Sequence, residues 1–313
     1  MATCSFPGGA QFAFTIVDDT DDTTLENGRP IYDLLTEIGL RTTKTVWAFD
    51  SAPSDRGPYF AAETLQDPDY LSWVTGLAET GFEIAFHGAS MGSTRREKTI
   101  AALDFIEQRF PGSPRLHCNH GQNRENLYWG SARYAIRLLS MTYRVLLERR
   151  GDGGFEGEIP GSPFFWGDVA RRRLPNIRAF SFNRINCSDI PPGRPFYDHK
   201  KPFVNRWFNS SDVPDATVFK RVITPQAIEE LCATRGWCIV STHLGKGFCS
   251  GGTVDPTVAS TLRHISSMPG WFVPASVLLE HLWQELGSHQ LTWAERLRME
   301  CAHVADRVGG RLA

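Results

Sequence analysis

Short apolar runs alternate with amphipathic, helix-like stretches along most of the chain, and this alternation restricts the fold more than any other feature. The stretch 31–38, for example, has apolar residues at helical spacing and is closed by Gly39. Repeated strand–helix units favour a mainly parallel sheet. The sequence therefore predicts an α/β fold, a distorted parallel (β/α) barrel of about seven strands. The predicted strands lie at 12–17, 45–49, 82–86, 115–118, 178–182, 238–242 and 271–273.

We expect one large domain followed by a helix. Residues 1–285 are predicted to form the barrel, with irregular excursions on its rim at 151–163 and 191–214. The first excursion is rich in Gly and acidic residues, and the second in Pro, aromatic residues and Asn. Long irregular connections in compact domains are often functional. Residues 286–313 are predicted to form a C-terminal amphipathic helix packed on the barrel.

The overall charge and the cysteines limit the choice of partners and compartment. The chain has 33 Lys and Arg against 35 Asp and Glu, a net charge of −2, which does not favour nucleic acid or an anionic membrane as partner. It has neither a run of about 18 apolar residues nor a signal-peptide pattern at its start. Seven cysteines without a CxxC pair are typical of reduced thiols. We therefore expect a cytoplasmic protein of undetermined oligomeric state.

Carboxylates and imidazoles follow four of the predicted strands. In a parallel barrel the C-terminal strand ends form one mouth, so these side chains should meet there. Two adjacent carboxylates at such a mouth require a cation, a hydrogen-bond donor or a proton to offset their repulsion. A divalent ion held by oxygen and imidazole ligands would do so and would make hydroxide available. The sequence thus predicts a metal-binding, hydrolase-like site formed by Asp18, Asp19, His87, His117, His120 and His243.

Two further acidic residues follow the first strand, in the segment DDTDD. A loop that leads into a helix favours Asp and Thr as capping residues. We therefore expect Asp21 and Asp22 to be structural. Of the other two carboxylates, we expect Asp19 to be a metal ligand and Asp18 to be the base.

Several of these segments resemble the motifs of the polysaccharide deacetylase family, the NodB-homology or carbohydrate esterase family 4 enzymes, over roughly residues 10–275. FTIVDDTD resembles the strand that ends in T-F-D-D-G, and GFEIAFHGASM resembles the strand before H-[ST]-x-x-H, with Met91 where the second histidine stands. HCNHG corresponds to R-x-P-Y-G, and STHLGKGF corresponds to the last histidine motif. The resemblance implies a NodB-like barrel, related to the TIM barrel.

The resemblance also implies roles for the site residues. Asp18 would be the general base and His243 the general acid, while His117 would stand where the family has the arginine that orients the base. Asp19 and His87 would bind the metal, with His120 as the relocated third ligand and His117 close behind it. The implied activity is removal of an acyl group, most simply N-acetyl, from an amino sugar or glycan. The implied cofactor is a divalent ion, Zn first, with Co, Ni, Mn or Fe also compatible.

The segment that follows the fourth strand is suited to sugar recognition, because aromatic faces stack on pyranose rings and amides read hydroxyls. A packed loop is an equally open interpretation of the same segment. Two other functions also stay open: an inactive carbohydrate-binding relative that has lost its metal, and a barrel glycoside hydrolase with Glu83, Asp189 or Glu158 as second acid. The expected substrate-binding residues are Asn119, Gly121, Asn123, Asn126, Tyr128 and Trp129.

Overall fold

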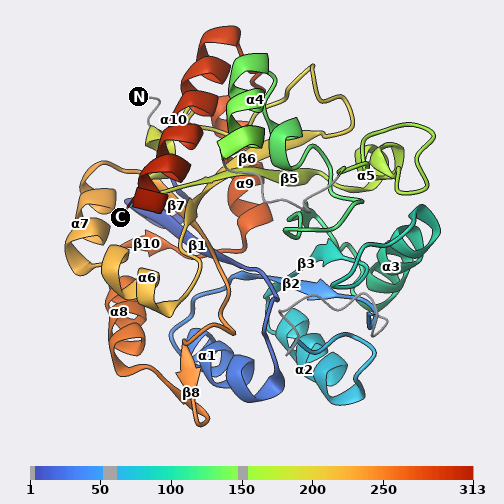
Figure 1. Ribbon diagram of the computed structural model, residues 1–313. Helices are drawn as coiled ribbons and strands as arrows, with labels where there is room; N and C mark the ends of the chain where they lie inside the picture. Colours follow the sequence, from blue (N-terminus) through green and yellow to red (C-terminus); the bar gives the residue numbers. More distant parts are fainter. Residues whose placement is uncertain (1–3, 52–61, 147–153, 313) are drawn as a thin grey trace.

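Seven parallel strands form a closed ring in the computed structural model, which describes residues 4–51, 62–146 and 154–312 (Figure 1). Each strand of the ring pairs with the next, and β7 pairs back onto β1 in parallel from Ala13 to Asp18. The predicted (β/α) barrel is thus confirmed. The ring consists of β1 (Phe12–Asp18), β2 (Thr43–Trp47), β3 (Glu83–Gly88), β4 (Leu116–His117), β5 (Asn176–Phe182), β6 (Arg206–Asp212) and β7 (Trp237–Thr242).

Helices surround the ring, so most strands are covered on both faces (Figure 1). Every residue of β1 is buried, as expected for a parallel strand between a barrel interior and a helical layer. Local caps set several helix starts: the Thr24 side chain accepts from Asn27 N, and the Asp67 side chain accepts from Tyr70 N. The helices are α1 (Leu25–Glu37), α2 (Pro68–Glu79), α3 (Arg96–Arg109), α4 (Arg137–Leu146), α5 (Gly167–Arg173), α6 (Ala216–Val222), α7 (Pro225–Ala233), α8 (Pro256–Ser267), α9 (Ala275–Leu286) and α10 (Trp293–Leu312).

One barrel strand lies inside the segment predicted to be a rim excursion, and that prediction is wrong for β6. The sequence RWFNSSD lacks the apolar run of the other strands, because its interior positions carry small polar side chains. These side chains pair with a neighbouring strand, as shown by the 2.9 Å contact between the Ser181 and Ser210 hydroxyls. The predicted strand at 271–273 instead appears as the short β10 (Gly270–Trp271), which pairs with the first residues of β1.

The other predicted excursion, 151–163, is described only from residue 154 onward, and there it contains neither helix nor strand. No helix in the described ranges is long and apolar enough to cross a membrane.

The C-terminal helix α10 packs against α4 and β5 and reaches the barrel mouth. Its buried Glu300 carboxylate accepts hydrogen bonds from the backbone N–H groups of Ala135 and Ile136, at 2.9 and 3.0 Å. One turn later, His303 Nδ1 lies 2.6 Å from the Tyr134 hydroxyl. These contacts fix α10 to the segment before α4 and place its last turns beside the ends of β5 and β6 (Figure 1).

Candidate active site

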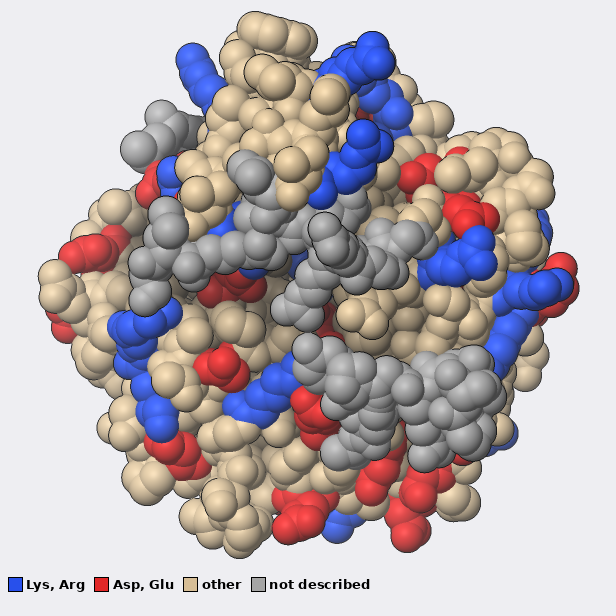
Figure 2. All heavy atoms as spheres, in the orientation of Figure 1, with Lys and Arg blue, Asp and Glu red and all other residues tan. Residues whose placement is uncertain are grey.

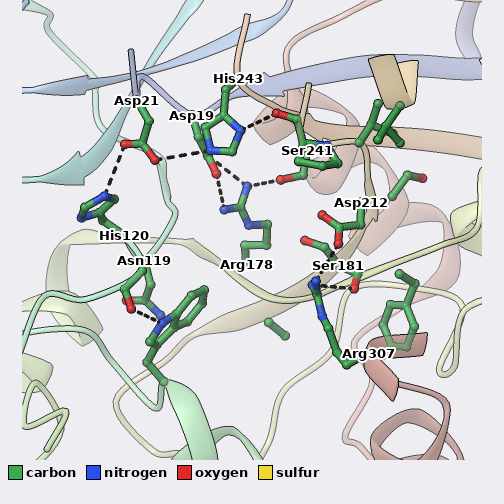
Figure 3. Close-up of a pocket in the computed structure, with 18 of the residues that line it drawn as sticks. Asp19, Asp21, Asn119, His120, Arg178, Ser181, Asp212, Ser241, His243 and Arg307 are labelled. Carbon is green, nitrogen blue, oxygen red and sulfur yellow. Dashed lines mark hydrogen bonds and ion pairs between the residues drawn. The ribbon is translucent and has the colours of Figure 1, made fainter. Parts of the chain in front are cut away.

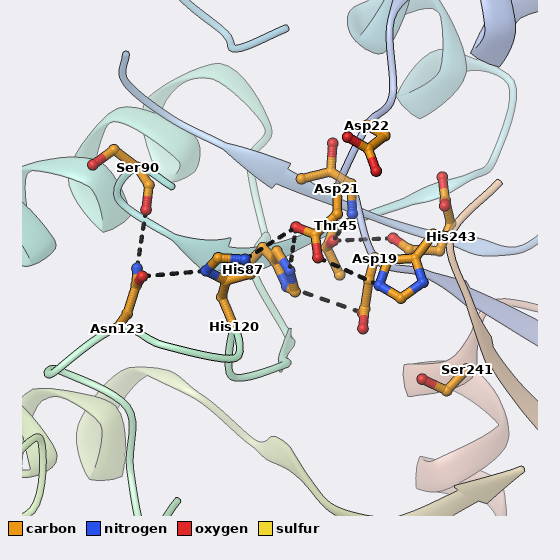
Figure 4. Close-up of polar contacts among 12 residues, drawn as sticks. Asp19, Asp21, Asp22, Thr45, His87, Ser90, His120, Asn123, Ser241 and His243 are labelled. Atoms are coloured by element: carbon orange, nitrogen blue, oxygen red, sulfur yellow. Dashed lines mark hydrogen bonds and ion pairs between the residues drawn. The ribbon is translucent and has the colours of Figure 1, made fainter. Parts of the chain in front are cut away.

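Asp21 lies at the centre of a group of three histidines at the barrel mouth (Figure 4). Its Oδ1 atom is 3.4 Å from His87 Nε2 and 3.5 Å from His120 Nε2, and its Oδ2 atom is 3.3 Å from His243 Nε2. The three histidines come from three different strand ends: His87 lies in the last part of β3, His120 follows β4 and His243 follows β7. Asp21 does not cap the next helix, because Thr24 is the cap of α1 and the loop after β1 turns the Asp21 carboxylate into the barrel mouth.

Three buried atoms of this cluster have no hydrogen-bond partner in the part of the chain that the structure describes: Asp21 Oδ1 and both ring nitrogens of His87. Buried polar atoms without partners are costly and usually mark a missing ligand, ion or water. Two ligand atoms bound to one tetrahedral ion at about 2.1 Å lie about 3.4 Å apart, close to the spacings of Asp21 Oδ1 from His87 and His120. The chemistry of these donors suits a divalent ion, although among the described residues no group of three or more His, Cys, Asp or Glu side chains is placed so that it could hold one.

The charge states of these groups suit metal binding. Burial opposes ionisation of Asp21, but the nearby imidazoles of His120, His243 and His87 outweigh it and hold the pKa of Asp21 well below its usual value. Burial lowers the pKa of the His120 imidazole, even against the opposite effect of Asp21. A negative carboxylate and a neutral imidazole are the forms that bind a metal.

Neighbouring groups orient two of the rings. His120 Nδ1 is 3.2 Å from Asn123 Oδ1, which leaves Nε2 to face Asp21. His243 Nδ1 donates to the Pro214 carbonyl oxygen at 2.7 Å, which likewise leaves Nε2 toward Asp21. Such outer contacts fix ring orientation at metal and proton-transfer sites.

Asp19 faces the barrel interior and forms a two-point ion pair with Arg178 from β5 (Figure 3). The two hydrogen bonds from the guanidinium measure 3.0 and 2.5 Å, and the same guanidinium donates to the Ser241 hydroxyl at 2.6 Å. Burial opposes ionisation of Asp19, but Arg178 outweighs it and lowers the pKa of the carboxyl. Asp19 Oδ1 is 4.0 Å from His87 Nδ1, so this ionised carboxylate lies beside the cluster instead of at its centre.

Asp18 lies outside the pocket, which does not fit the predicted role of general base. Its carboxylate accepts hydrogen bonds from the Tyr32 hydroxyl, the Lys44 ammonium and the backbone N–H of Leu244, at 2.9, 3.0 and 2.8 Å. Successive side chains of a strand point to opposite faces. Because Asp19 points into the barrel, Asp18 points to the layer between β1 and α1, where Lys44 neutralises it.

The Lys44–Asp18 pair should be important for stability, since both side chains are fully buried. Replacing Lys44 with Met leaves a buried carboxylate without its counter-ion, so we expect the free energy of unfolding to fall by roughly 3 kcal/mol. Urea unfolding measures this change. The matched control is Arg263→Met, which removes an exposed partner of Glu37 and should leave the unfolding midpoint almost unchanged. Equal effects of both substitutions would contradict the role assigned to Lys44.

His117 is a core residue in this fold and does not line the pocket. Its ring nitrogens lie 2.9 Å from the Phe86 carbonyl oxygen and 3.0 Å from Asn119 Oδ1. The ring packs edge-on against Trp166 with centroids 5.2 Å apart. Burial lowers the pKa of His117 to about 4, so it stays neutral. The side chain that pairs with a carboxylate at the barrel mouth is Arg178, which contacts Asp19.

The loop after β4 uses most of its amides internally. Asn119 exchanges two hydrogen bonds with the backbone of Leu127, and Asn123 Nδ2 donates to the carbonyl oxygens of Ser90 and Gly92. Asn126 donates to the carbonyl oxygen of His120. These contacts brace the histidine loop, and a packed loop describes the amides better than free sugar-binding groups.

The other residues predicted to bind substrate divide between the pocket and the core. Gly121 and Trp129 line the pocket, as do Asn119 and Asn123, whereas Asn126 and Tyr128 do not. The Tyr128 ring packs against Trp207, with centroids 6.0 Å apart.

Asp19 and Asp21 open into one cavity of about 1130 Å³. This volume lies slightly above the range of about 300–1,000 Å³ that is usual for small-molecule sites. It extends from the histidine cluster past Arg178 to the last turns of α10, where Arg307 forms a 2.8 Å ion pair with Asp212 (Figure 3). Met91, at the position of the missing family histidine, also lines it.

Comparisons with known proteins agree with the fold. No known family profile and no curated protein sequence matches the chain. Among solved structures, a Mycobacterium smegmatis protein assigned as a polysaccharide deacetylase matches with a TM-score of 0.51 and 12% identity, over 93% of this chain and 97% of that chain. The PuuE allantoinase matches with a TM-score of 0.52 and 12% identity, over 91% of this chain and 94% of that chain.

A Pseudomonas aeruginosa PAO1 protein, also assigned as a polysaccharide deacetylase, matches with a TM-score of 0.50 and 12% identity, over 91% of this chain and 95% of that chain. At this identity the comparisons establish a shared fold. The chain has the barrel of the NodB-type polysaccharide deacetylases, as the resemblance of its motifs implied.

Proposed function

We propose that the protein is a metal-dependent hydrolase that cleaves an acyl C–N bond, most simply the N-acetyl group of an amino sugar or glycan. The observation that carries this proposal is the group of buried, unpartnered ligand atoms on Asp21 and His87 opposite His120. A barrel shared with deacetylases and an allantoinase supports the same reaction class by analogy.

The ligand set in this proposal is Asp21, His87 and His120. It keeps two of the three ligands expected from the sequence and replaces Asp19 with Asp21. Zinc is the first candidate, because one carboxylate and two imidazoles leave a tetrahedral ion an open position, and Co, Ni, Mn or Fe are also compatible. When bound, such an ion polarises the acyl carbonyl and makes hydroxide available near neutral pH.

Asp19 is the general base in this proposal. Its carboxylate lies next to the cluster and is ionised, and Arg178 holds it in one orientation through two hydrogen bonds. Asp19 accepts the proton of the attacking water as the new C–O bond forms. Arg178 therefore takes the positioning role that the motif comparison had given to His117.

His243 is the general acid. Burial opposes its protonation, but the hydrogen bond to Asp21 and the charge of Asp19 outweigh burial and raise the pKa of the imidazole. The Nδ1 proton is committed to Pro214, so Nε2 is the atom that delivers a proton to the departing amine nitrogen as the C–N bond breaks. The products are a carboxylic acid and a free amine.

The two alternative functions fit the pocket less well. An inactive relative was suggested by Met91, but His120 supplies an imidazole to the same carboxylate that His87 faces. A glycoside hydrolase needs two suitably placed acids, and none of the three candidate second acids, Glu83, Glu158 and Asp189, is among the described residues that line the cavity.

The proposal is tested with protein purified without chelator. We expect about one equivalent of a divalent ion per chain, and release of acetate or formate from N-acylated amino sugars that stops on chelation and returns when the metal is restored. Absence of acyl release by the metal-loaded protein across N-acetyl and N-formyl amino sugars and their oligomers would contradict the proposed activity.

A further inference from the structure

The cavity is larger than an acylated amine requires. The wall opposite the histidine cluster, here called the far wall, is formed by a different set of elements. This wall contains residues at and after the ends of β5 and β6 and in the last turns of α10, together with the end of η3 (Gly130–Arg133). A substrate that binds at Asp21 and fills the cavity must contact this wall with the part of the molecule that does not react. The described lining residues with charged side chains on this wall are Arg133, Arg184, Asp212, Arg221, Asp306 and Arg307.

Arg133 is unusual among these residues because its guanidinium is buried and has no acidic partner in the described ranges. The residue is 7% exposed, and its buried Nε atom has no hydrogen-bond partner there. The guanidinium carbon lies 3.2 Å from the centre of the Trp129 ring and 5.9 Å from that of Phe180. Stacking on Trp129 fixes the plane of the guanidinium but does not neutralise its charge.

The neighbouring cations do not share this property. Arg178 is paired with Asp19, and Arg307 with Asp212. Burial, together with repulsion from Arg307 and Arg178, lowers the pKa of Arg133 to about 10, so the side chain still carries a full charge near neutral pH. A buried charge without a counter-ion is strongly unfavourable, and a ligand that brings the opposite charge removes this penalty.

The positive charge of Arg133 is a feature of the cavity and not of the protein surface as a whole. Acidic and basic side chains are interspersed over the face of the molecule seen in Figure 2. The net charge of the chain is −2, so a general attraction for polyanions does not account for the placement of Arg133.

We propose that Arg133 is an anion-binding residue of the substrate site, and that the substrate is an acylated amino sugar that carries an oxyanion, either a carboxylate or a phosphate. This inference rests on the proposed function, because it concerns the part of the substrate that lies away from the reacting acyl group. A planar guanidinium presents paired N–H donors that match both oxyanions, and Trp129 holds it in one plane.

The test is calorimetric binding of three ligands: N-acetylglucosamine, N-acetylmuramic acid, which adds a carboxylate, and N-acetylglucosamine 1-phosphate. We expect wild-type protein to bind at least one of the two anionic ligands about 10- to 100-fold more tightly than the neutral sugar. The anionic ligand that binds more tightly shows whether the site prefers a carboxylate or a phosphate. The measurement is repeated after treatment with chelator, so that contact of the anion with a metal does not account for the preference.

The matched variants are Arg133→Gln and Arg144→Gln. Arg144 is exposed on α4 and does not line the cavity, so its replacement removes the same charge from the surface. We expect Arg133→Gln to abolish the preference for the anionic ligand without changing affinity for the neutral sugar, and Arg144→Gln to keep the preference. Arg133→Lys should retain part of it, because the charge remains but the paired donors do not. Melting temperatures report whether each variant is folded.

Equal affinities of wild-type protein for the neutral and anionic sugars would overturn the inference, as would a folded Arg133→Gln variant that keeps the preference. A further measurement needs no variant: inorganic phosphate should displace the preferred anionic sugar from wild-type protein but not the neutral one, and failure to displace it would also overturn the inference. Metal content and acyl release are read separately. A protein that binds metal and releases acyl groups but shows no anion preference refutes only the role of Arg133.

Discussion

Replacement of Asp21 by Asn should leave the protein folded but without its bound divalent ion and without hydrolytic activity. Asp21 is the one carboxylate placed between His87 and His120, and its Oδ1 atom has no other partner in the described residues. The amide has the same shape but no negative charge, so it is a much poorer ligand. We expect acyl release to fall by at least about 10³-fold, measured with metal content on the same preparation.

The matched control is Asp22→Asn. Asp22 is the next residue, but its carboxylate faces Lys246 at 3.6 Å, away from the histidines. Its φ angle is +61°, a conformation that Asn tolerates. Metal content and turnover should therefore stay close to wild type. An Asp21→Asn protein that still holds one equivalent of metal and still turns over would contradict the assignment of Asp21.

Replacement of Asp19 by Asn should separate catalysis from metal binding. The variant loses the base that Arg178 orients, but it keeps the three proposed metal ligands. We expect turnover to fall by up to about 10⁴-fold, with metal content and KM nearly unchanged. Steady-state kinetics together with elemental analysis measure both quantities.

Asp18→Asn is the control for this experiment, because the motif comparison had assigned the base to Asp18. Asp18 contacts Tyr32, Lys44 and Leu244 and does not line the cavity. Its replacement should lower stability, since Lys44 loses its counter-ion, but turnover measured well below the melting temperature should persist. Loss of turnover in folded Asp18→Asn protein, with turnover retained in Asp19→Asn, would return the role of base to Asp18.

Much of the barrel could be predicted from sequence because apolar strand runs and helix caps are local signals. The stretch 31–38 and the run 12–17 correspond closely to α1 and β1. β6 was missed because its small polar side chains, such as Ser210, pair inside the fold with a strand far away in the sequence. No local pattern reports such a pairing.

The two adjacent carboxylates lie in different places: Asp19 pairs with Arg178 in the barrel interior, whereas Asp18 pairs with Lys44 and Tyr32 outside the cavity. The alternation of side chains along a strand predicts that Asp18 and Asp19 face opposite sides of the barrel wall, but every residue of β1 is buried, so no polar face marks which of the two points inward. The basic partners of these two carboxylates are also visible in the sequence. Lys44 and Arg178 are charged residues inside otherwise buried strands, and a buried charged residue needs a partner of opposite charge. The path of the loop that turns Asp21 inward is not visible in the sequence.

The residues that form the far wall of the cavity could not be predicted from the sequence. Arg133 and the last turns of α10 are more than 150 residues apart along the chain and meet only because Glu300 and His303 fix α10 beside the segment that follows η3. A pattern of apolar residues predicts that α10 packs on the barrel, but not which of its ends reaches the mouth.

The most direct test of the central claim is anomalous diffraction from crystals of the wild-type protein loaded with zinc. We expect a single strong peak at the barrel mouth, within about 2.0–2.2 Å of an Asp21 carboxylate oxygen and of the Nε2 atoms of His87 and His120, with Asp19 beside it and paired with Arg178. A peak bound by Asp19 in place of Asp21, or well-ordered crystals of zinc-soaked protein without a peak at this cluster, would contradict it.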